Sequence, residues 1–373
     1  MFNRRRCAPL LAVAFAVVGA TACSPRAKIG IVLPETGAAA VYGASIRTGI
    51  ALAFDAHATG ADTRIEVTYR DSASDPQRAA GAAEALFEQG VDLIIGGVTS
   101  SEAKAMIPVA DRWRRVLLSP SASDPALGRL SRWFFRIFPS DELEGVSAAN
   151  LVAASGGGRR VLIFQQDNDY TRGLLPIFVE ELGRRGGRVV DSLRIDETGW
   201  ERGLHRLLDE LDPTAAYVCG YGDAIIASVG ALRAASFRGL ICTTSAITTA
   251  SLLERAGATL DGVVFPLIPF DPAAQTEPVR GFVARYRTIY NLQPDIYAAL
   301  GYDAATTALR ALTGARSKGK PDLPDRLREL GPLDGLFGRF RFDDQGGVRR
   351  TLTAHWVHHG RVEPWPLQAA RQP

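Results

Sequence analysis

DLIIGGVTSSE, residues 92–102, is the stretch that decides the fold. Its first residues, Asp92 to Ile95, form a short apolar run that predicts a buried strand, and a helix is predicted from Glu102 to Arg112. Glycines end the strand, and hydroxyl residues follow where a helix N-terminus needs hydrogen-bond acceptors. A strand that leads directly into a helix is typical of strand-helix-strand units, so this stretch predicts a parallel sheet.

The same alternation continues on both sides of this stretch. Further strands are predicted at residues 28–33, 64–70 and 116–118, with helices at 44–55 and 77–89. Beyond Pro139 a second series follows, with strands at residues 160–164, 189–195, 215–219 and 240–243. Two consecutive series of similar size predict an α/β protein with two lobes, each a mostly parallel sheet flanked by helices.

The last third of the chain follows a different pattern. Pro266, Pro269 and Pro272 exclude a helix there, and helices are then predicted at residues 279–290 and 295–313. Near the C-terminus, Gly338 to Phe342 and Thr351 to Val357 flank a turn and predict a hairpin.

The N-terminus has the pattern of an export signal. Three arginines, Arg4 to Arg6, precede an apolar run from Ala8 to Ala20, which is shorter than the roughly 20 residues that a membrane-spanning helix needs. The run ends in Ala20-Thr21-Ala22-Cys23, which resembles the lipobox of bacterial lipoproteins and implies diacylation of Cys23 and an anchored mature chain. The same tetrapeptide also fits cleavage by ordinary signal peptidase, which would leave the protein free of the membrane.

Composition and charge exclude several classes of protein. The chain is 46% hydrophobic and 22% charged, as expected of a folded globular protein. Its net charge of +3 includes the three arginines of the signal, so 3 − 3 leaves the mature chain near zero and predicts no nucleic-acid surface. Cys219 and Cys242 remain in the mature chain, either as a disulfide or as two free thiols.

Two polar strand ends stand out as a binding site. Val98-Thr99-Ser100-Ser101 opens one helix, and Ser119-Pro120-Ser121-Ala122-Ser123 follows the next strand. Backbone N–H groups at a helix N-terminus, together with the helix dipole and a serine hydroxyl, form an anion site. The carboxyl ends of neighbouring parallel strands form the usual ligand crevice of such folds, so we expect a ligand here.

Enzymatic and metal chemistry have weaker support. Ser101-Glu102-Ala103-Lys104 fits the Ser-x-x-Lys pattern of penicillin-recognising enzymes, but the partner motifs SDN and KTG are absent from the sequence. His355 and His358 would point to opposite faces of a strand, without a Cys or carboxylate cluster beside them. We therefore predict a non-enzymatic protein that needs no cofactor and no metal.

Five motifs in order resemble the leucine/isoleucine/valine-binding protein family, the type I periplasmic binding proteins. They are Lys28-Ile29-Gly30-Ile31 with Thr36-Gly37 and Tyr42-Gly43, Arg70-Asp71-Ser72-Ala73-Ser74-Asp75-Pro76, the Ile95 to Glu102 strand end, Ser119 to Ser123, and Phe342-Asp343 with Gly346. The resemblance covers nearly the whole mature chain. It implies a two-lobed fold in which crossing segments near Pro139, Pro266 and Thr351 form a three-strand hinge.

The resemblance also implies the boundaries of the parts and the ligand contacts. The parts are a signal peptide at 1–22, a lipid-anchored linker at 23–27, lobe 1 at 28–139 plus 268–350, and lobe 2 at 140–267 plus 351–373. A ligand carboxylate would meet the hydroxyls of Ser100 and Ser123 and backbone groups of Ser121 and Val98. The tyrosines expected to cover the ligand are Tyr42 from the first lobe and Tyr170 and Tyr221 from the second.

One position departs from the family pattern. Amino-acid binders of this family carry an acidic residue near the end of a second-lobe strand, which pairs with the ligand's ammonium, and here Ser245 stands in that place. A buried ammonium without a partner is costly. Either another carboxylate, such as Asp223 or Asp303, takes over the role, or the ligand has no amine.

The function implied is that of an extracytoplasmic solute-binding component of an ABC importer, which captures a small carboxylate-bearing or amino-acid-like solute. Its expected partners are a permease and an ATPase, and its expected location is the periplasm or the cell surface. A ligand-sensing lipoprotein or a lipoprotein that activates a cell-wall enzyme would share the fold, and an enzyme would need an activated Ser100 or Ser101.

Overall fold

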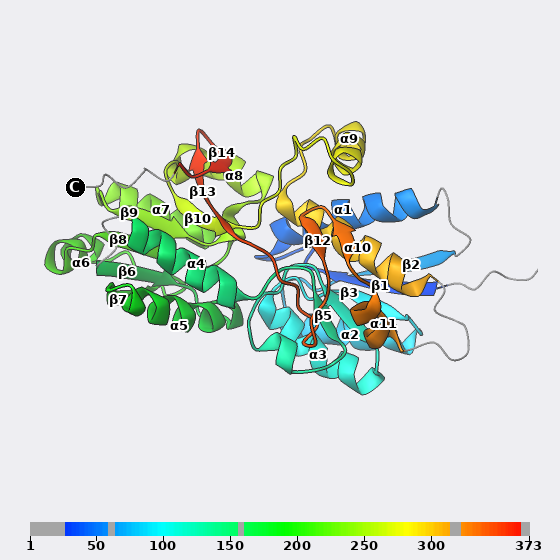
Figure 1. Cartoon of the computed structure of the whole chain (residues 1–373). Helices are drawn as coiled ribbons and strands as arrows, with labels where there is room; N and C mark the ends of the chain where they lie inside the picture. The colour runs from blue at the N-terminus through cyan, green and yellow to red at the C-terminus, as the bar shows by residue number, and fades with distance from the viewer. Residues whose placement is uncertain (1–26, 59–63, 156–159, 314–321, 367–373) are drawn as a thin grey trace, which may run out of the picture.

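The protein has two lobes, each built on its own sheet (Figure 1). This computed structural model describes residues 27–58, 64–155, 160–313 and 322–366. Both lobes alternate strands and helices as the sequence predicts, and the two-lobed α/β architecture is confirmed. The chain passes between the lobes three times, after Arg136, after Leu267 and before Thr353.

The first lobe contains a five-stranded parallel sheet in the order β2-β1-β3-β4-β5. Its strands are β1 (Ala27–Leu33), β2 (Ile65–Asp71), β3 (Leu93–Gly96), β4 (Val116–Ser119) and β5 (Phe134–Arg136). Helices α1 (Ala40–Ala58), α2 (Pro76–Glu88) and α3 (Ser100–Trp113) connect them, and a 3₁₀ turn, η1 (Leu127–Arg129), precedes β5. The central strands are fully buried, because helices cover both faces of the sheet.

A later part of the chain completes this lobe. Helices α9 (Val279–Tyr290), α10 (Ile296–Leu312) and α11 (Leu323–Glu329) and the small hairpin of β11 (Leu333–Gly335) and β12 (Gly338–Phe340) return to it. Helix α10 lies directly on α1 at two glycines: a Cβ atom at Gly49 would stand 1.8 Å from the Ala298 carbonyl oxygen, and one at Gly301 would stand 2.2 Å from that of Ile46. Only glycine permits the two backbones to approach this closely.

The second lobe contains a seven-stranded sheet in the order β14-β13-β10-β9-β8-β6-β7. Its strands are β6 (Arg160–Gln165), β7 (Arg188–Arg194), β8 (Ala215–Cys219), β9 (Leu240–Thr243), β10 (Val264–Leu267), β13 (Thr353–His358) and β14 (Arg361–Pro364). Its helices are α4 (Asp141–Ala154), α5 (Asp169–Arg184), α6 (Leu204–Leu211), α7 (Gly222–Ala234) and α8 (Ala250–Ala256), with 3₁₀ turns η2 (Ser245–Ile247) and η3 (Gly257–Leu260). Within this sheet, β13 runs antiparallel to both β10 and β14.

The hairpin predicted near the C-terminus is wrong in its pairing. β12 pairs with β11, and only a single bridge, Phe342 to Val348, spans the predicted turn. The chain then crosses to the other lobe, where β13 pairs with β10. Local turn chemistry cannot reveal this, because the partner strand that β13 extends lies about 90 residues earlier.

The two cysteines of the second lobe do not form a disulfide. Cys219 and Cys242 are free buried thiols, so the second of the two alternatives left open by the sequence holds.

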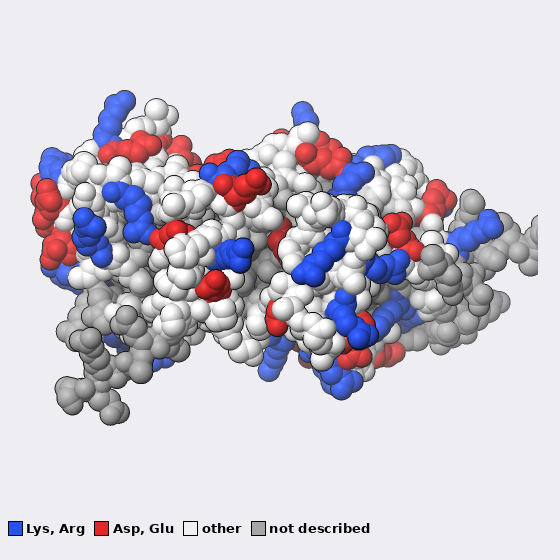
Figure 2. Space-filling model, turned by 90° about the horizontal axis from the view of Figure 1, so that it is seen from above, with Lys and Arg blue, Asp and Glu red and all other residues white. Residues whose placement is uncertain are grey.

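The surface and the helices bear on contacts with nucleic acid and membrane. Figure 2 shows basic and acidic side chains interspersed over both lobes on the face in view. Within the residues that the structure describes, no helix is long and apolar enough to cross a membrane.

Candidate ligand-binding site

A small cavity lies between the two lobes and receives side chains from both. It is lined by Tyr42, Val98, Thr99, Ser121, Ser123, Phe138, Glu144, Tyr170, Tyr221, Ser245, Ala246 and Tyr297. The space open to water is about 30 Å³, enough for roughly two water molecules. All the ligand-contact residues expected from the sequence line this cavity, with the exception of Ser100.

The first-lobe wall begins at the end of β3. Thr99 caps helix α3: its side-chain oxygen accepts the Glu102 N–H at 3.2 Å, and the Glu102 carboxylate accepts the Thr99 N–H at 3.1 Å. Gly97 has φ +67°, and a Cβ atom there would lie 2.9 Å from Ala103. The turn therefore requires glycine, and it brings Val98 and Thr99 to the cavity.

The loop after β4 is tied to this turn by its own hydroxyls. Ser119 Oγ donates to the Gly97 carbonyl at 2.7 Å, and Ser121 Oγ donates to the Val98 carbonyl at 2.7 Å. Ser123 also lines the cavity, and its carbonyl accepts a hydrogen bond from Arg136 at 2.9 Å. The hydroxyls of Ser119 and Ser121, in the predicted anion site, thus hold the ends of β3 and β4 together. We call the arrangement seen here, with the two lobes in contact, the closed arrangement.

Ser100 occupies a different position from the one expected. It is 1% exposed, and its Oγ accepts the N–H groups of Ser123 at 3.4 Å and Asp124 at 3.2 Å. Its side chain lies behind the cavity wall, where it orients the Ser123 segment. The residue just before it, Thr99, is the one that reaches the cavity.

Four tyrosines surround the cavity. Tyr170, in the first turn of α5, stacks on Tyr221, the N-cap of α7, with ring centroids 5.1 Å apart. Tyr42 on α1 contacts Tyr221 at 5.9 Å and Tyr297 on α10 at 4.9 Å between centroids. Tyr297 and Phe138 were not anticipated from the sequence. Burial raises the pKa of each of these four tyrosines, so their hydroxyls stay protonated.

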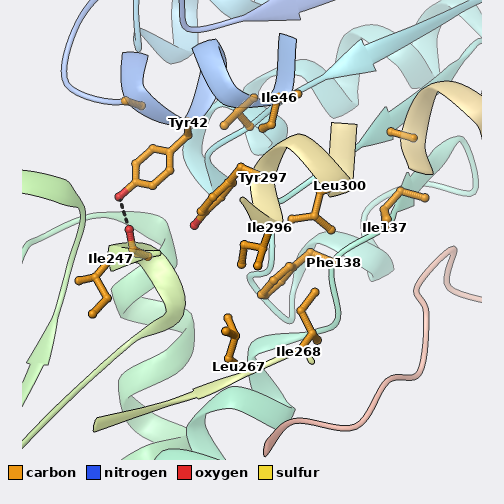
Figure 3. Packing of buried hydrophobic residues seen from close by; sticks show 14 of the residues in the cluster. Tyr42, Ile46, Ile137, Phe138, Ile247, Leu267, Ile268, Ile296, Tyr297 and Leu300 are labelled. Carbon is orange, nitrogen blue, oxygen red and sulfur yellow. Dashed lines mark hydrogen bonds between the residues drawn. The ribbon is translucent and has the colours of Figure 1, made fainter. Parts of the chain in front are cut away.

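Tyr42 joins the two lobes directly. Its hydroxyl donates to the Ala246 carbonyl at 2.9 Å and accepts the Gly222 N–H at 2.8 Å. Figure 3 shows the ring reaching from α1, beside Tyr297 and Ile46, toward the segment that carries Ile247. A second connection lies outside the cavity, where the Asp295 carboxylate of the first lobe accepts the Ala250 N–H of the second at 3.2 Å. These contacts hold the lobes together.

Glu144 is the acidic residue of the cavity, and sequence reasoning missed it. Its carboxylate accepts the Ser245 N–H at 2.7 Å and the Ser245 hydroxyl at 3.3 Å. Burial raises its pKa to about 7, although both hydrogen bonds from Ser245 oppose this shift. Helix α4 thus brings a carboxylate to the place where the acidic residue at position 245 is absent.

The two carboxylates considered as substitutes lie elsewhere. The Asp223 side chain is 80% exposed and pairs with Arg255 at 2.6 Å. Asp303 is buried in the first lobe near the hinge, where its carboxylate accepts the Leu336 N–H and faces Arg350. Neither residue lines the cavity.

Asp141 lies beside Glu144 on α4 and is fully buried. Burial and the neighbouring Glu144 raise its pKa well above the usual range, whereas the Ser123 hydroxyl and the Arg136 guanidinium lower it. Arg136 donates to the Ser123 and Asp124 carbonyls at 2.9 and 2.8 Å. The positive charge of buried Arg136 therefore acts on Asp141, and Arg136 is not among the residues that line the cavity.

The signal that could have revealed Glu144 is its position in the chain. The sequence Ser140-Asp141-Glu142-Leu143-Glu144 follows directly on the first crossing segment, so the first turn of α4 must begin at the cleft. Acidic residues in a first helical turn are common because of the helix dipole, and they are easily explained without a ligand. Within the described ranges, no cluster of three or more His, Cys, Asp or Glu side chains has the arrangement of a metal site.

Comparison with known proteins agrees with this architecture. A family model described as "Periplasmic binding protein" matches residues 26–357. Leu/Ile/Val-binding protein homolog 1 of Brucella abortus is 24% identical, over 85% of this chain and 86% of that protein. The leucine binding protein LivK of Thermotoga maritima has a similar structure, with a TM-score of 0.84, 26% identity, and coverage of 91% of this chain and 98% of that one.

A solute-binding protein from R. palustris, solved in complex with benzoate, shares the fold. Its TM-score is 0.81 at 18% identity, over 91% of this chain and 95% of that one. The fold thus occurs both in a protein named for leucine and in one that binds an aromatic carboxylate. With its two sheets, its hinge and the match over most of its length, the chain belongs to the periplasmic binding protein family and is similar to its branched-chain amino acid binding members.

Proposed function

We propose that this protein is the extracytoplasmic solute-binding component of an ABC importer and captures a small carboxylate-bearing solute by closing its two lobes. The observation that carries the proposal is the cavity between the lobes, lined by strand-end residues of both. A cavity of about 30 Å³ is too small for a solute of several heavy atoms, so the lobes separate before ligand enters.

The carboxylate would bind at the strand ends of the first lobe. Ser121 and Ser123 would supply hydroxyls there. The backbone N–H groups of Val98 and Ser121 would exchange the bonds they make in this structure, to the Glu102 carboxylate and to Ser119 Oγ at 3.3 Å. In this structure the Ser121 hydroxyl donates a hydrogen bond to the Val98 carbonyl. A bound carboxylate would accept the hydrogen bond from this hydroxyl in place of the carbonyl. Ser100 supports this wall by holding the N–H groups of Ser123 and Asp124.

Export, anchoring and partners complete the proposal. Cys23 lies outside the described residues, and its lipidation is supported by the lipobox-like Ala20-Thr21-Ala22-Cys23. A lipid at Cys23 would hold the protein at the membrane next to its permease and ATPase. Mass spectrometry of the mature N-terminus tests this, and a mature chain that begins with an unmodified Cys23 would contradict it.

A thermal-shift screen of the purified full chain tests the ligand class. The panel pairs each acid with its amide: L-leucine with L-leucinamide, L-alanine with L-alaninamide, and benzoate with benzamide. A ligand at 100 times its Kd stabilises the folded protein by about 2.7 kcal/mol, and we expect such a shift for at least one acid and none for its amide. Equal shifts for acid and amide would contradict the carboxylate site, and a panel without any shift would contradict the proposed ligand class.

A further inference from the structure

We propose that Glu144 selects the charge of the ligand, so that the solute must carry a protonated amine in addition to its carboxylate. The inference rests on the proposed function and narrows it. The resemblance to amino-acid binders predicted an acidic residue at position 245, which is absent here, and the structure places an acid in the same region from a different helix.

The side chains around the cavity carry only one ionisable acid and no cation. Among its lining residues, Glu144 is the sole carboxylate, and none is Lys, Arg or His. The other polar lining groups are hydroxyls and backbone. An ionised carboxylate in such a setting attracts a cationic group of a ligand and repels a second anion.

The two groups that hold Glu144 come from the same residue, Ser245. The Ser245 N–H and hydroxyl donate to different carboxylate oxygens, at 2.7 and 3.3 Å. Each carboxylate oxygen accepts more than one hydrogen bond, so both keep capacity for a donor from the cavity. Ser245 therefore replaces the acidic residue expected at this position and also orients another acid, Glu144.

Among the residues that the structure describes, no cation pairs with Glu144: its pKa is set by burial and by the hydrogen bonds from Ser245. The titratable side chains whose charge interacts with it are acids or neutral at physiological pH, and they come from α4, α5, β8, β9 and α10: Asp141, Tyr170, Tyr217, Cys219, Cys242 and Tyr297. Arg136 acts on Asp141 and donates to backbone carbonyls. Burial raises the pKa of Glu144 to about 7, and the hydrogen bonds from Ser245 are the groups that oppose this shift.

The arrangement separates two ligand classes that this fold can bind. A simple carboxylate such as benzoate would place its charge in a cavity that already contains Glu144, whereas an amino acid brings the missing positive group. We therefore expect this chain to prefer zwitterions to simple acids, although it shares the fold of a benzoate-bound protein.

Calorimetric titration of the wild-type full chain with matched pairs tests the inference. Each pair is an α-amino acid and the same acid without its amine: L-leucine with 4-methylpentanoate, L-alanine with propanoate, and L-phenylalanine with 3-phenylpropanoate. At pH 8, where Glu144 is ionised, we expect the amine-bearing member of the binding pair to bind at least about 30-fold more tightly. Equal affinity within a pair, or tighter binding of the acid without amine, would overturn the inference and leave the proposed function intact.

The variant Glu144→Gln removes the charge and nearly preserves the shape. We expect this variant to bind the amine-bearing ligand about 30-fold or more weakly than the wild type does. Its preference for the amine-bearing member of each pair should fall to a few-fold. Glu142→Gln is the matched control, because Glu142 lies in the same helical turn with its side chain 59% exposed, and it should change neither value. A Glu144→Gln protein that keeps the wild-type preference would also overturn the inference. A panel in which no carboxylate of either kind binds would overturn the proposed function together with it.

Discussion

Two buried carboxylates, one in the first lobe near the hinge and one in the cavity, have opposite surroundings. Asp303 in α10 accepts the Leu336 N–H with both oxygens, at 2.9 and 3.1 Å, and faces the buried guanidinium of Arg350 at 3.7 Å. Glu144 in α4 accepts hydrogen bonds from Ser245 alone within the described part of the chain. Burial raises both pKa values, to about 6 and about 7.

The difference separates a structural acid from a binding acid. Arg350 lies on the third crossing segment and also donates to the carbonyl of Ile137, on the first crossing segment, and to that of Phe337, in the β11–β12 turn. The Asp303–Arg350 pair is therefore tied to two of the three segments that connect the lobes. A buried charge that is paired with an opposite charge in the same chain is neutralised without a ligand. Glu144 lacks that counter-charge, which leaves it for the solute.

Removal of the hinge cation should have the largest effect. We expect Arg350→Met to lower the free energy of unfolding by about 3–5 kcal/mol, because Asp303 would remain buried without its positive partner. Urea unfolding followed by circular dichroism measures this. Arg349→Met is the control, since Arg349 is exposed, and should stay within about 0.5 kcal/mol of the wild type. Equal stabilities for the two variants would show that Asp303 needs no cation, and the contrast with Glu144 would fail.

Loss of the cross-lobe hydroxyl should have an intermediate effect. Tyr42→Phe removes the hydrogen bonds to Ala246 and Gly222, which we expect to weaken the closed arrangement by about 1–3 kcal/mol. Small-angle X-ray scattering without ligand should then show a larger radius of gyration than for the wild type. Tyr290→Phe is the control, because the Tyr290 hydroxyl donates to Thr48 within the first lobe. A radius unchanged by Tyr42→Phe would show that other contacts suffice for closure.

The smallest effect should be a pH dependence that belongs to Glu144. Its pKa in the folded protein, about 7, exceeds the usual 4.5, so the folded state binds more protons between these values. Stability therefore falls as pH rises from about 4.5 to about 7. Glu144→Gln should lack this component, and its stability relative to the wild type should increase by about 1 kcal/mol from pH 6 to pH 7, as measured by urea unfolding at each pH. Parallel pH profiles for the two proteins would show that Glu144 is not buried as an acid.

The sequence predicted part of the cavity lining in each lobe and missed residues in both. The two polar segments were identified because they follow strands of a parallel sheet, where local order along the chain fixes the location, and the family resemblance singled out Val98, Ser121 and Ser123 within them. Ser100 was expected to face the ligand, but one residue of helical rotation separates it from Thr99, and that rotation is set by the cap. Tyr297 and Phe138 reach the cavity from distant parts of the chain and carry no local signal.

The course of β13 and the role of Glu144 share one cause. β13 pairs with β10 and not with β12, and the α4 carboxylate meets Ser245 from about 100 residues away. Both depend on which distant segments the hinge brings together, and turn or cap patterns contain no information about that. Ser245 does stand where amino-acid binders carry an acid, but its hydrogen bonds to Glu144 show that an acid reaches this region from α4.

The sequence by itself determined the two lobes, the parallel sheets and the polar strand ends, because these follow from hydrophobic periodicity and capping over short windows. Tertiary structure alone decided the electrostatics of the cavity. Whether a buried acid is neutralised depends on the charges within a few ångströms in space, and for Asp303 and Glu144 those neighbours come from remote parts of the chain.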